Sequence, residues 1–258
     1  MEFFIATATD KGIKRPTNQD HLFAEKYVTK NGTCVFAILC DGMGGLQHGE
    51  LASASIVSAF TQWAETRLPV MQGPFKDQMD HVIREEWTAI TLSENQKIRA
   101  YGRENNCTLG STVTAMLLSE ERFFILNIGD TRAYELCGQS RQLTADHTVI
   151  ADEISLGNMT PSQAEESPMK NVLTRCVGVF DRVYPDMFFG DTKTDAVYML
   201  CSDGFRHCLS PDEMLEHLMP RSDDPVLELQ RAEKALIEMD IQRGETDNIS
   251  VVAVYVRP

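Results

Sequence analysis

The stretch TCVFAILCDG, residues 33–42, is the most informative part of the sequence. Residues 33–40 form a continuous β-type run of mostly apolar side chains, which predicts a buried strand, and the Asp-Gly pair that follows ends it. Beyond this pair the apolar side chains recur at helical spacing. Those on one face of this expected helix are Ala52, Ile56, Ala59, Phe60 and Trp63.

The rest of the chain contains similar elements in consecutive groups. Further β-type runs cover residues 3–9, 21–28, 111–119, 121–130, 131–137, 196–203 and 248–256. Helical spacing returns over about 75–90 and 225–239, and another helix is expected from Pro211 with Ser210 as its N-cap. Because strands come in groups separated by pairs of helices, we expect an α+β fold with two antiparallel sheets and helices packed outside them. A single domain over residues 1–258 is the simplest organisation.

Composition excludes several classes of protein. The 258 residues include 38 acidic and 24 basic side chains, a formal charge of −14. No cluster of Lys and Arg is present to bind a phosphate backbone, so we expect no nucleic-acid partner and no anionic membrane surface. No apolar run is long enough to span a membrane. Seven cysteines without a CxxC pair are typical of free thiols in a reducing compartment, so we expect a cytoplasmic protein.

Aspartates stand at the termini of four β-type runs. Asp41 directly follows such a run, Asp130 and Asp203 are the last residues of theirs, and Asp247 comes just before the final run. An isolated Asp-Gly is usually only a turn. If the last strand is antiparallel to its neighbours, however, all four carboxylates meet at one edge. Like charges gathered in this way need a cation, and all-oxygen ligation suits magnesium or manganese.

Eight short motifs give the sequence a specific resemblance. They are RPTNQD (15–20), CDGMGGLQHGE (40–50), GST (110–112), NIGDTR (127–132), LTADHT (143–148), LTRCVG (173–178), CSDGF (201–205) and ETDNISVV (245–252). In this order they resemble the metal-dependent protein phosphatase family (PPM, type 2C), particularly its bacterial members. The resemblance implies a four-layer αββα sandwich, that is, two antiparallel sheets flanked by helix pairs. It also implies hydrolysis of phosphoserine and phosphothreonine in proteins by attack of a metal-bridging hydroxide.

The resemblance also implies ligands for two Mn²⁺ or Mg²⁺ ions. Asp41 would bridge both ions, and the carbonyl of Gly42 would bind one of them. Asp203 and Asp247 would complete the other. Asp130, with Asp203, would match the ligands of a third, weaker ion.

Four further expectations follow from the same resemblance. Arg15 would bind the phosphate oxygens, for which a planar guanidinium is suited. Asp20 would reach an ion through water or orient a ligand. Met43 occupies the position of a histidine proposed as the general acid in eukaryotic members, and methionine has no proton to donate. The polar segment at about 148–171, expected to form a short helix or two and a loop, matches a variable flap that influences substrate choice.

The partners implied are phosphoserine and phosphothreonine proteins, including a cognate serine/threonine kinase or its substrates, in bacterial signalling. We expect a monomer. Two other functions stay open at this point: a pseudophosphatase that binds phosphoproteins without turnover, and a hydrolase of small phosphoesters. The four aspartates argue against the first, because a degenerate member should have lost ligands.

Overall fold

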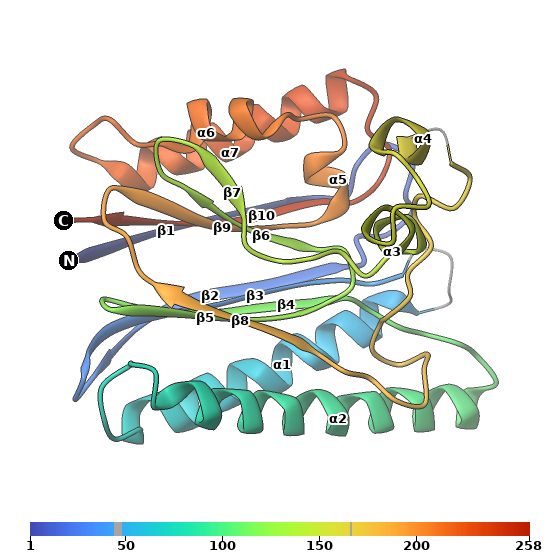
Figure 1. Ribbon diagram of the computed structural model, residues 1–258, viewed down its shortest axis with the longest axis horizontal. Coiled ribbons are helices and arrows are strands. Elements are labelled where there is room, and N and C mark those ends of the chain that lie inside the picture. The colour runs from blue at the N-terminus through green and yellow to red at the C-terminus, as the bar shows by residue number, and fades with distance from the viewer. Residues whose placement is uncertain (44–47, 166) are drawn as a thin grey trace.

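Two antiparallel sheets lie face to face, and helices cover the outer face of each (Figure 1). The computed structural model describes residues 1–43, 48–165 and 167–258. One sheet has the order β1 (Glu2–Asp10), β10 (Ile249–Arg257), β9 (Ala196–Cys201), β6 (Arg132–Leu136) and β7 (Ser140–Gln142). The other has the order β2 (Asp20–Thr29), β3 (Gly32–Asp41), β4 (Val113–Ser119), β5 (Arg122–Ile128) and β8 (Asp186–Asp191). The expected αββα sandwich is confirmed.

The helices fall into two outer layers and one end group. The long helices α1 (Gly49–Arg67) and α2 (Met79–Asn105), with the short 3-10 turn η1 (Leu68–Val70) between them, cover the β2–β3 sheet. Helices α6 (Pro211–Leu218) and α7 (Pro225–Gln242) cover the β1–β10 sheet. The short helices α3 (Val149–Ser155), α4 (Pro161–Glu165) and α5 (Asp203–Arg206) lie at one end of the sandwich, at the right in Figure 1. Both termini lie at the opposite end.

The continuous apolar run at residues 33–40 is explained by burial of both faces of β3. Successive side chains of a strand point to opposite faces. Val35, Ala37 and Leu39 lie in the core between the two sheets. The residues that alternate with them, among them Phe36 and Ile38, lie in the core between the β2–β3 sheet and the helices.

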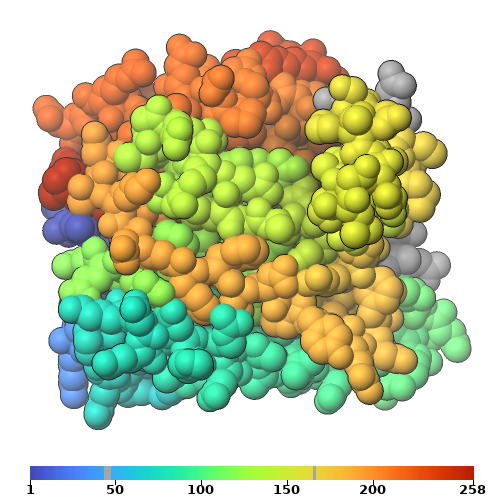
Figure 2. All heavy atoms as spheres, in the orientation of Figure 1, coloured from blue at the N-terminus to red at the C-terminus, as the bar shows by residue number. Residues whose placement is uncertain are grey.

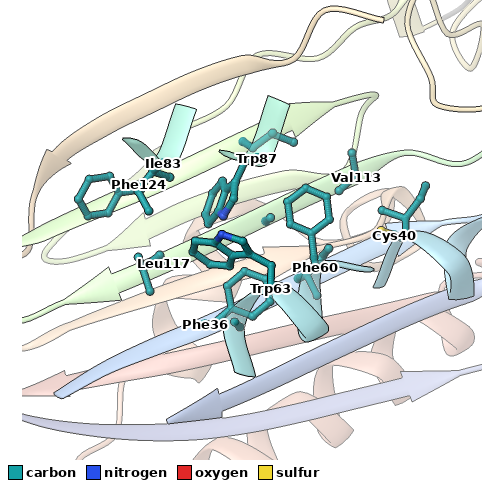
Figure 3. Packing of buried hydrophobic residues seen from close by; sticks show 14 of the residues in the cluster. Phe36, Cys40, Phe60, Trp63, Ile83, Trp87, Val113, Leu117 and Phe124 are labelled. Carbon is teal, nitrogen blue, oxygen red and sulfur yellow. The ribbon is translucent and has the colours of Figure 1, made fainter. Parts of the chain in front are cut away.

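An aromatic cluster fills the core under α1 and α2 (Figure 3). The rings of Trp63 and Trp87 meet edge to face, with centroids 5.4 Å apart and planes at 80°. Phe36 of β3 lies 5.9 Å from Trp63 and 6.0 Å from Trp87, centroid to centroid. Offset and edge-to-face pairs of this kind add stability beyond the area that they bury. These ring contacts hold α1 and α2 against β3, the strand that ends in Asp41.

Several elements differ from the sequence-based expectation: η1, β7 and α5 were not predicted, and the helix expected from about residue 75 begins at Met79. Helix α2 continues about fifteen residues past Ile90. Most of its later inward positions are polar or small, so they do not continue the apolar pattern. Thr91, Glu94, Asn95, Ile98 and Gly102 occupy these positions. The edge strand β8 was not predicted, since its side chains are only half-buried and show no alternation. Within residues 148–171 the expected short helices are α3 and α4.

Candidate active site

The four aspartates expected to gather line one cavity of about 260 Å³. Arg15 and Met43 line it as well. The complete lining is Arg15, Asp41, Met43, Thr112, Asp130, Asn171, Leu173, Asp203 and Asp247. The structure therefore brings together residues that are up to 232 positions apart in the chain.

Strand direction explains this convergence. Strand β3 ends in Asp41, and β9 ends two residues before Asp203. Strand β10 starts two residues after Asp247 and is antiparallel to β9, so its beginning lies at the end of β9. Asp130 stands in the short connection from β5 to β6. The condition that the last strand be antiparallel to its neighbours is met.

The glycines after two of the aspartates are required by close backbone packing. A Cβ on Gly42 would lie 2.4 Å from the carbonyl oxygen of Gly49. A Cβ on Gly204 would lie 2.2 Å from the carbonyl oxygen of Asn248. Both neighbours are backbone atoms that cannot turn aside, so any larger residue would displace the chain next to Asp41 or Asp203.

Asp41 is at the centre of the carboxylate group. Its N–H donates to Oγ1 of Thr112 at 2.9 Å, and its carbonyl accepts from the N–H of Thr112 at 2.9 Å. Burial raises the pKa of Asp41 well above its ordinary value, and the charges of Asp20, Asp203, Asp130 and Asp247 add to this shift. Repulsion of this kind is what a bound cation would relieve.

Asp20 lies directly opposite Asp41 in the β2–β3 pairing. It is 6% exposed, and in the described part of the chain neither of its carboxylate oxygens has a hydrogen-bond partner. Burial raises the pKa of Asp20 to about 7, with a further contribution from the charge of Asp203. Asp20 does not line the cavity, and its expected role, to reach an ion through water or to orient a ligand, stays a prediction.

Arg15 and Asp247 contact each other at the cavity. Nε of Arg15 donates to Oδ1 of Asp247 at 2.7 Å, and Nη2 donates to Oδ2 at 2.5 Å. Both side chains keep about a third of their surface exposed, 36% for Arg15 and 28% for Asp247. An exposed pair is weakly bound because solvent screens it, so either partner is available to a ligand that enters the cavity.

Sequence reasoning missed the side chains that hold the loop before β10. Asn248 accepts from the N–H of Gln19 at 2.8 Å and donates to the carbonyls of Lys11 and Thr17, which ties the Arg15 loop to Asp247. Glu245 accepts from the N–H of Asp247 at 2.8 Å and is 3.0 Å from Nδ1 of His207. Only the Asp-Asn pair itself gives a signal in the sequence, and that signal is also typical of a turn opener.

Asp130 has an environment different from that of the other carboxylates. It is 7% exposed, and burial together with the charge of Asp203 raises its pKa to about 7. Nη2 of Arg206 lies 3.2 Å from its carbonyl oxygen and 3.4 Å from its Oδ2. Next to it, the N–H of Gly129 donates to Nδ1 of His147 at 3.1 Å, so His147 supports this connection.

The donor set fits hard divalent ions. The cavity is lined by carboxylates without histidine or cysteine, and one oxygen of Asp203 and both of Asp20 are buried and unpartnered within the described residues. Over residues 1–43, 48–165 and 167–258, no three acidic, histidine or cysteine side chains are placed so that they could hold a metal ion by themselves. Magnesium-like ions keep several waters and need no such set of side chains. The set therefore fits ions that are held partly through water.

The first Asp-Gly motif and the flap each include residues outside the described ranges. Residues 44–47 of the motif at 40–50, and residue 166 of the flap, lie outside the described residues. The α3–α4 part of the flap forms a raised patch at the same end of the molecule as α5, shown in yellow in Figure 2. Asn171 and Leu173, which follow it, line the cavity, so the flap segment borders the site.

No helix within the described ranges is both long and apolar enough to cross a bilayer.

A family model described as protein phosphatase 2C matches residues 13–239. Protein phosphatase PhpP of Streptococcus pneumoniae is 31% identical over 254 residues, which cover 97% of this chain and 96% of that protein. Serine/threonine phosphatase stp of Listeria monocytogenes is 29% identical over 248 residues, or 95% of this chain and 93% of the relative.

Solved structures show the same architecture. The S. agalactiae serine/threonine phosphatase has a TM-score of 0.83 and 27% identity, covering 99% of this chain and 100% of that one. The catalytic domain of the serine/threonine protein phosphatase PstP, in complex with two manganese ions, has a TM-score of 0.77 and 26% identity, covering 99% of both chains.

Proposed function

This chain belongs to the protein phosphatase 2C family, and we propose that it hydrolyses phosphoserine and phosphothreonine in proteins with two divalent ions held by the carboxylates of its cavity. The observation that carries this proposal is the arrangement of Asp41, Asp203, Asp247 and Arg15 around one cavity. The relatives PhpP and stp are named as phosphatases. Manganese is the ion we favour, since PstP binds two of them.

The ions would be shared among five residues. Asp41 would contact both, as the family resemblance implies, and the charges of the other four carboxylates raise its pKa. The carbonyl of Gly42 would contact one ion, and Asp203 and Asp247 would contact the other. Asp20, buried behind Asp41 with free oxygens, would orient a ligand or bind through water.

When bound, the divalent ions would lower the pKa of water towards neutrality and so supply the nucleophile. No nucleophilic side chain is then needed. The chain itself supplies the binding of the phosphate. The Arg15 guanidinium lies at the cavity with about a third of its surface exposed, and once released by Asp247 it can donate two parallel hydrogen bonds to phosphate oxygens. Met43 lines the cavity and has no proton to give. We therefore assign protonation of the leaving oxygen to water in the cavity.

The biological setting follows from the chemistry and from the chain. All proposed ligands come from one chain, so a monomer is sufficient for activity. The seven free cysteines suit a reducing cytoplasm. There we expect the substrates to be proteins phosphorylated by a cognate serine/threonine kinase, in bacterial signalling.

The decisive experiment is phosphate release from a phosphothreonine peptide. We expect activity with Mn²⁺, its loss on chelation, and a decrease of at least about 100-fold in Asp203→Asn, since even outer partners of a metal ligand cost up to about that much. Asp181→Asn, which removes an exposed carboxylate elsewhere, is the matched control and should be as active as the wild type.

Three outcomes separate the alternatives. Activity that survives chelation would exclude the two-ion mechanism. Binding of the phosphopeptide without turnover would indicate a pseudophosphatase. A kcat/KM that is higher for small phosphoesters than for the phosphopeptide would indicate a small-molecule hydrolase.

A further inference from the structure

Arg206 places a buried positive charge between two aspartates beside the active site. It is the last residue of α5, which begins with Asp203. Its Nη2 lies 3.4 Å from Oδ2 of Asp130 and 3.7 Å from Oδ2 of Asp146. All three side chains are nearly covered, with 13%, 11% and 13% of their surfaces exposed. The guanidinium is therefore the immediate counter-charge of Asp130.

The surrounding groups fix Arg206 in this position. Arg132 binds Asp146 with two hydrogen bonds, Nε to Oδ1 at 2.8 Å and Nη2 to Oδ2 at 2.7 Å. Arg206 also donates to the backbone carbonyl of Asp130 at 3.2 Å. The two arginines thus match the two aspartates in formal charge, and Asp130 has a positive partner that belongs to the chain itself.

The contact between Arg15 and Asp247 is of a different kind. It is about a third exposed, so an ion can replace the guanidinium there at little cost. Displacing Arg206 would instead leave a buried charge without its partner, which is strongly unfavourable. Arg206 also lines a neighbouring cavity of about 300 Å³ that shares Asp130 and Asn171 with the active site, so it stands at the boundary of the two.

We propose that the guanidinium of Arg206 takes the place of a third divalent ion at Asp130, so that this chain binds two ions and not three. This inference rests on the proposed function, because it concerns the same site. It departs from the third-ion role that the family resemblance implies for Asp130. That role requires a carboxylate open to an ion, whereas here the carboxylate already has a tethered cation.

Counting bound manganese tests this inference. Equilibrium dialysis and titration calorimetry with Mn²⁺ should give two ions per wild-type chain and three per Arg206→Gln chain. We expect the affinity for a third ion to be on the order of ten-fold higher in Arg206→Gln than in the wild type, where this affinity should be too weak to add to the count. Arg206→Lys keeps the charge and should stay at two. Arg175→Gln is the matched control, since it removes an arginine that pairs with Asp186 instead, and it should also stay at two.

A second variant keeps the test decisive if Arg206→Gln does not fold. Asp130→Asn in the otherwise unchanged chain should still bind two ions, and loss of an ion there would overturn the inference. So would three ions in the wild type, or an unchanged count of two in folded Arg206→Gln. A wild-type chain that binds no manganese would instead contradict the proposed function, which distinguishes the two failures.

Discussion

Asp20, Asp41, Asp130, Asp203 and Asp247 all lie at or near strand ends, but their surroundings differ. Asp41 is bound through its backbone to Thr112 and is surrounded by the other four carboxylates. Asp20 has no hydrogen-bond partner for its side chain among the described residues. Asp247 and Asp130 each contact an arginine, exposed in one case and buried in the other. These differences separate residues suited to bind an ion from one that already has its counter-charge.

Loss of the Arg15 guanidinium should weaken binding of the phosphorylated substrate. Arg15→Ala should raise KM for a phosphothreonine peptide by about 10- to 100-fold, because a hydrogen-bonded charged group contributes roughly 1.5–3 kcal/mol. Arg15→Lys should recover only part of this, since an ammonium cannot form the parallel pair of bonds. Steady-state kinetics at saturating Mn²⁺ would separate KM from kcat.

Arg257 provides the control for that measurement. It is also paired with a carboxylate, Glu2, but lies on β10 at the end where the chain termini are found. Arg257→Ala should therefore leave KM unchanged. If Arg15→Ala left KM unchanged as well, the phosphate-binding role of Arg15 would be wrong.

At the scale of the element, α7 combines an ordinary apolar face with two buried acids. Leu229, Leu236 and Ile237 pack in the core against the β1–β10 sheet, and Glu233 and Asp240 lie on the same face. In the described structure neither acid has a hydrogen-bond partner for its carboxylate oxygens. Burial raises the pKa of Glu233 to about 8, so this side chain is neutral in the folded protein at pH 7.

The raised pKa of Glu233 predicts that stability falls as pH rises. The folded chain keeps a proton that the unfolded chain loses above about pH 4.5, so the contribution is complete below that pH and is lost as pH rises to about 8. The slope between these limits is at most about 1.4 kcal/mol per pH unit. Glu233→Gln has a similar shape without the titration, and its gain in unfolding free energy over the wild type should grow from pH 5 to pH 8.

Urea unfolding at several pH values would measure this difference. Glu238→Gln, which removes an exposed carboxylate from the same helix, should unfold in parallel with the wild type at every pH. A difference between Glu233→Gln and the wild type that stayed constant from pH 5 to pH 8 would show that Glu233 is not held neutral by burial.

At the scale of the whole molecule, the core between the sheets joins the two halves of the sandwich. Val35, Leu39 and Leu118 from one sheet share this core with Tyr198 and Val254 from the other. Neither sheet can separate without exposing apolar surface, which is costly. We therefore propose that residues 1–258 fold as one domain.

One domain should unfold in a single transition. Trp63 and Trp87 both lie in the α1–α2 layer, so their fluorescence reports on that side of the sandwich. Far-UV circular dichroism also reports on α6 and α7 at the other side. In urea, with ions removed by a chelator so that binding does not shift stability, the two signals should have the same midpoint. Separate midpoints would show that the two layers unfold independently.

The sequence by itself predicted two antiparallel sheets with helices outside them, and an edge at which four carboxylates gather. Its apolar runs marked the strands, and Asp-Gly pairs marked where two of them end, because strand formation and turns depend on residues close together in the chain. The sequence predicted that the four carboxylates gather at one edge, provided that the last strand is antiparallel to its neighbours. Asp41, Asp203 and Asp247 are therefore candidate ligands on the strength of the sequence and its family resemblance.

Only the tertiary structure decided which partner each of these residues has. Arg15 meets Asp247 across 232 positions, and Arg206 meets Asp130 across 76, and no local pattern encodes such contacts. The same holds for the later turns of α2, where Asn95 is fixed by bonds to the backbone of Gly178 and Phe180 and not by apolar spacing. Hydrogen bonds and ion pairs depend on exact placement in space, whereas apolar periodicity depends only on order in the chain.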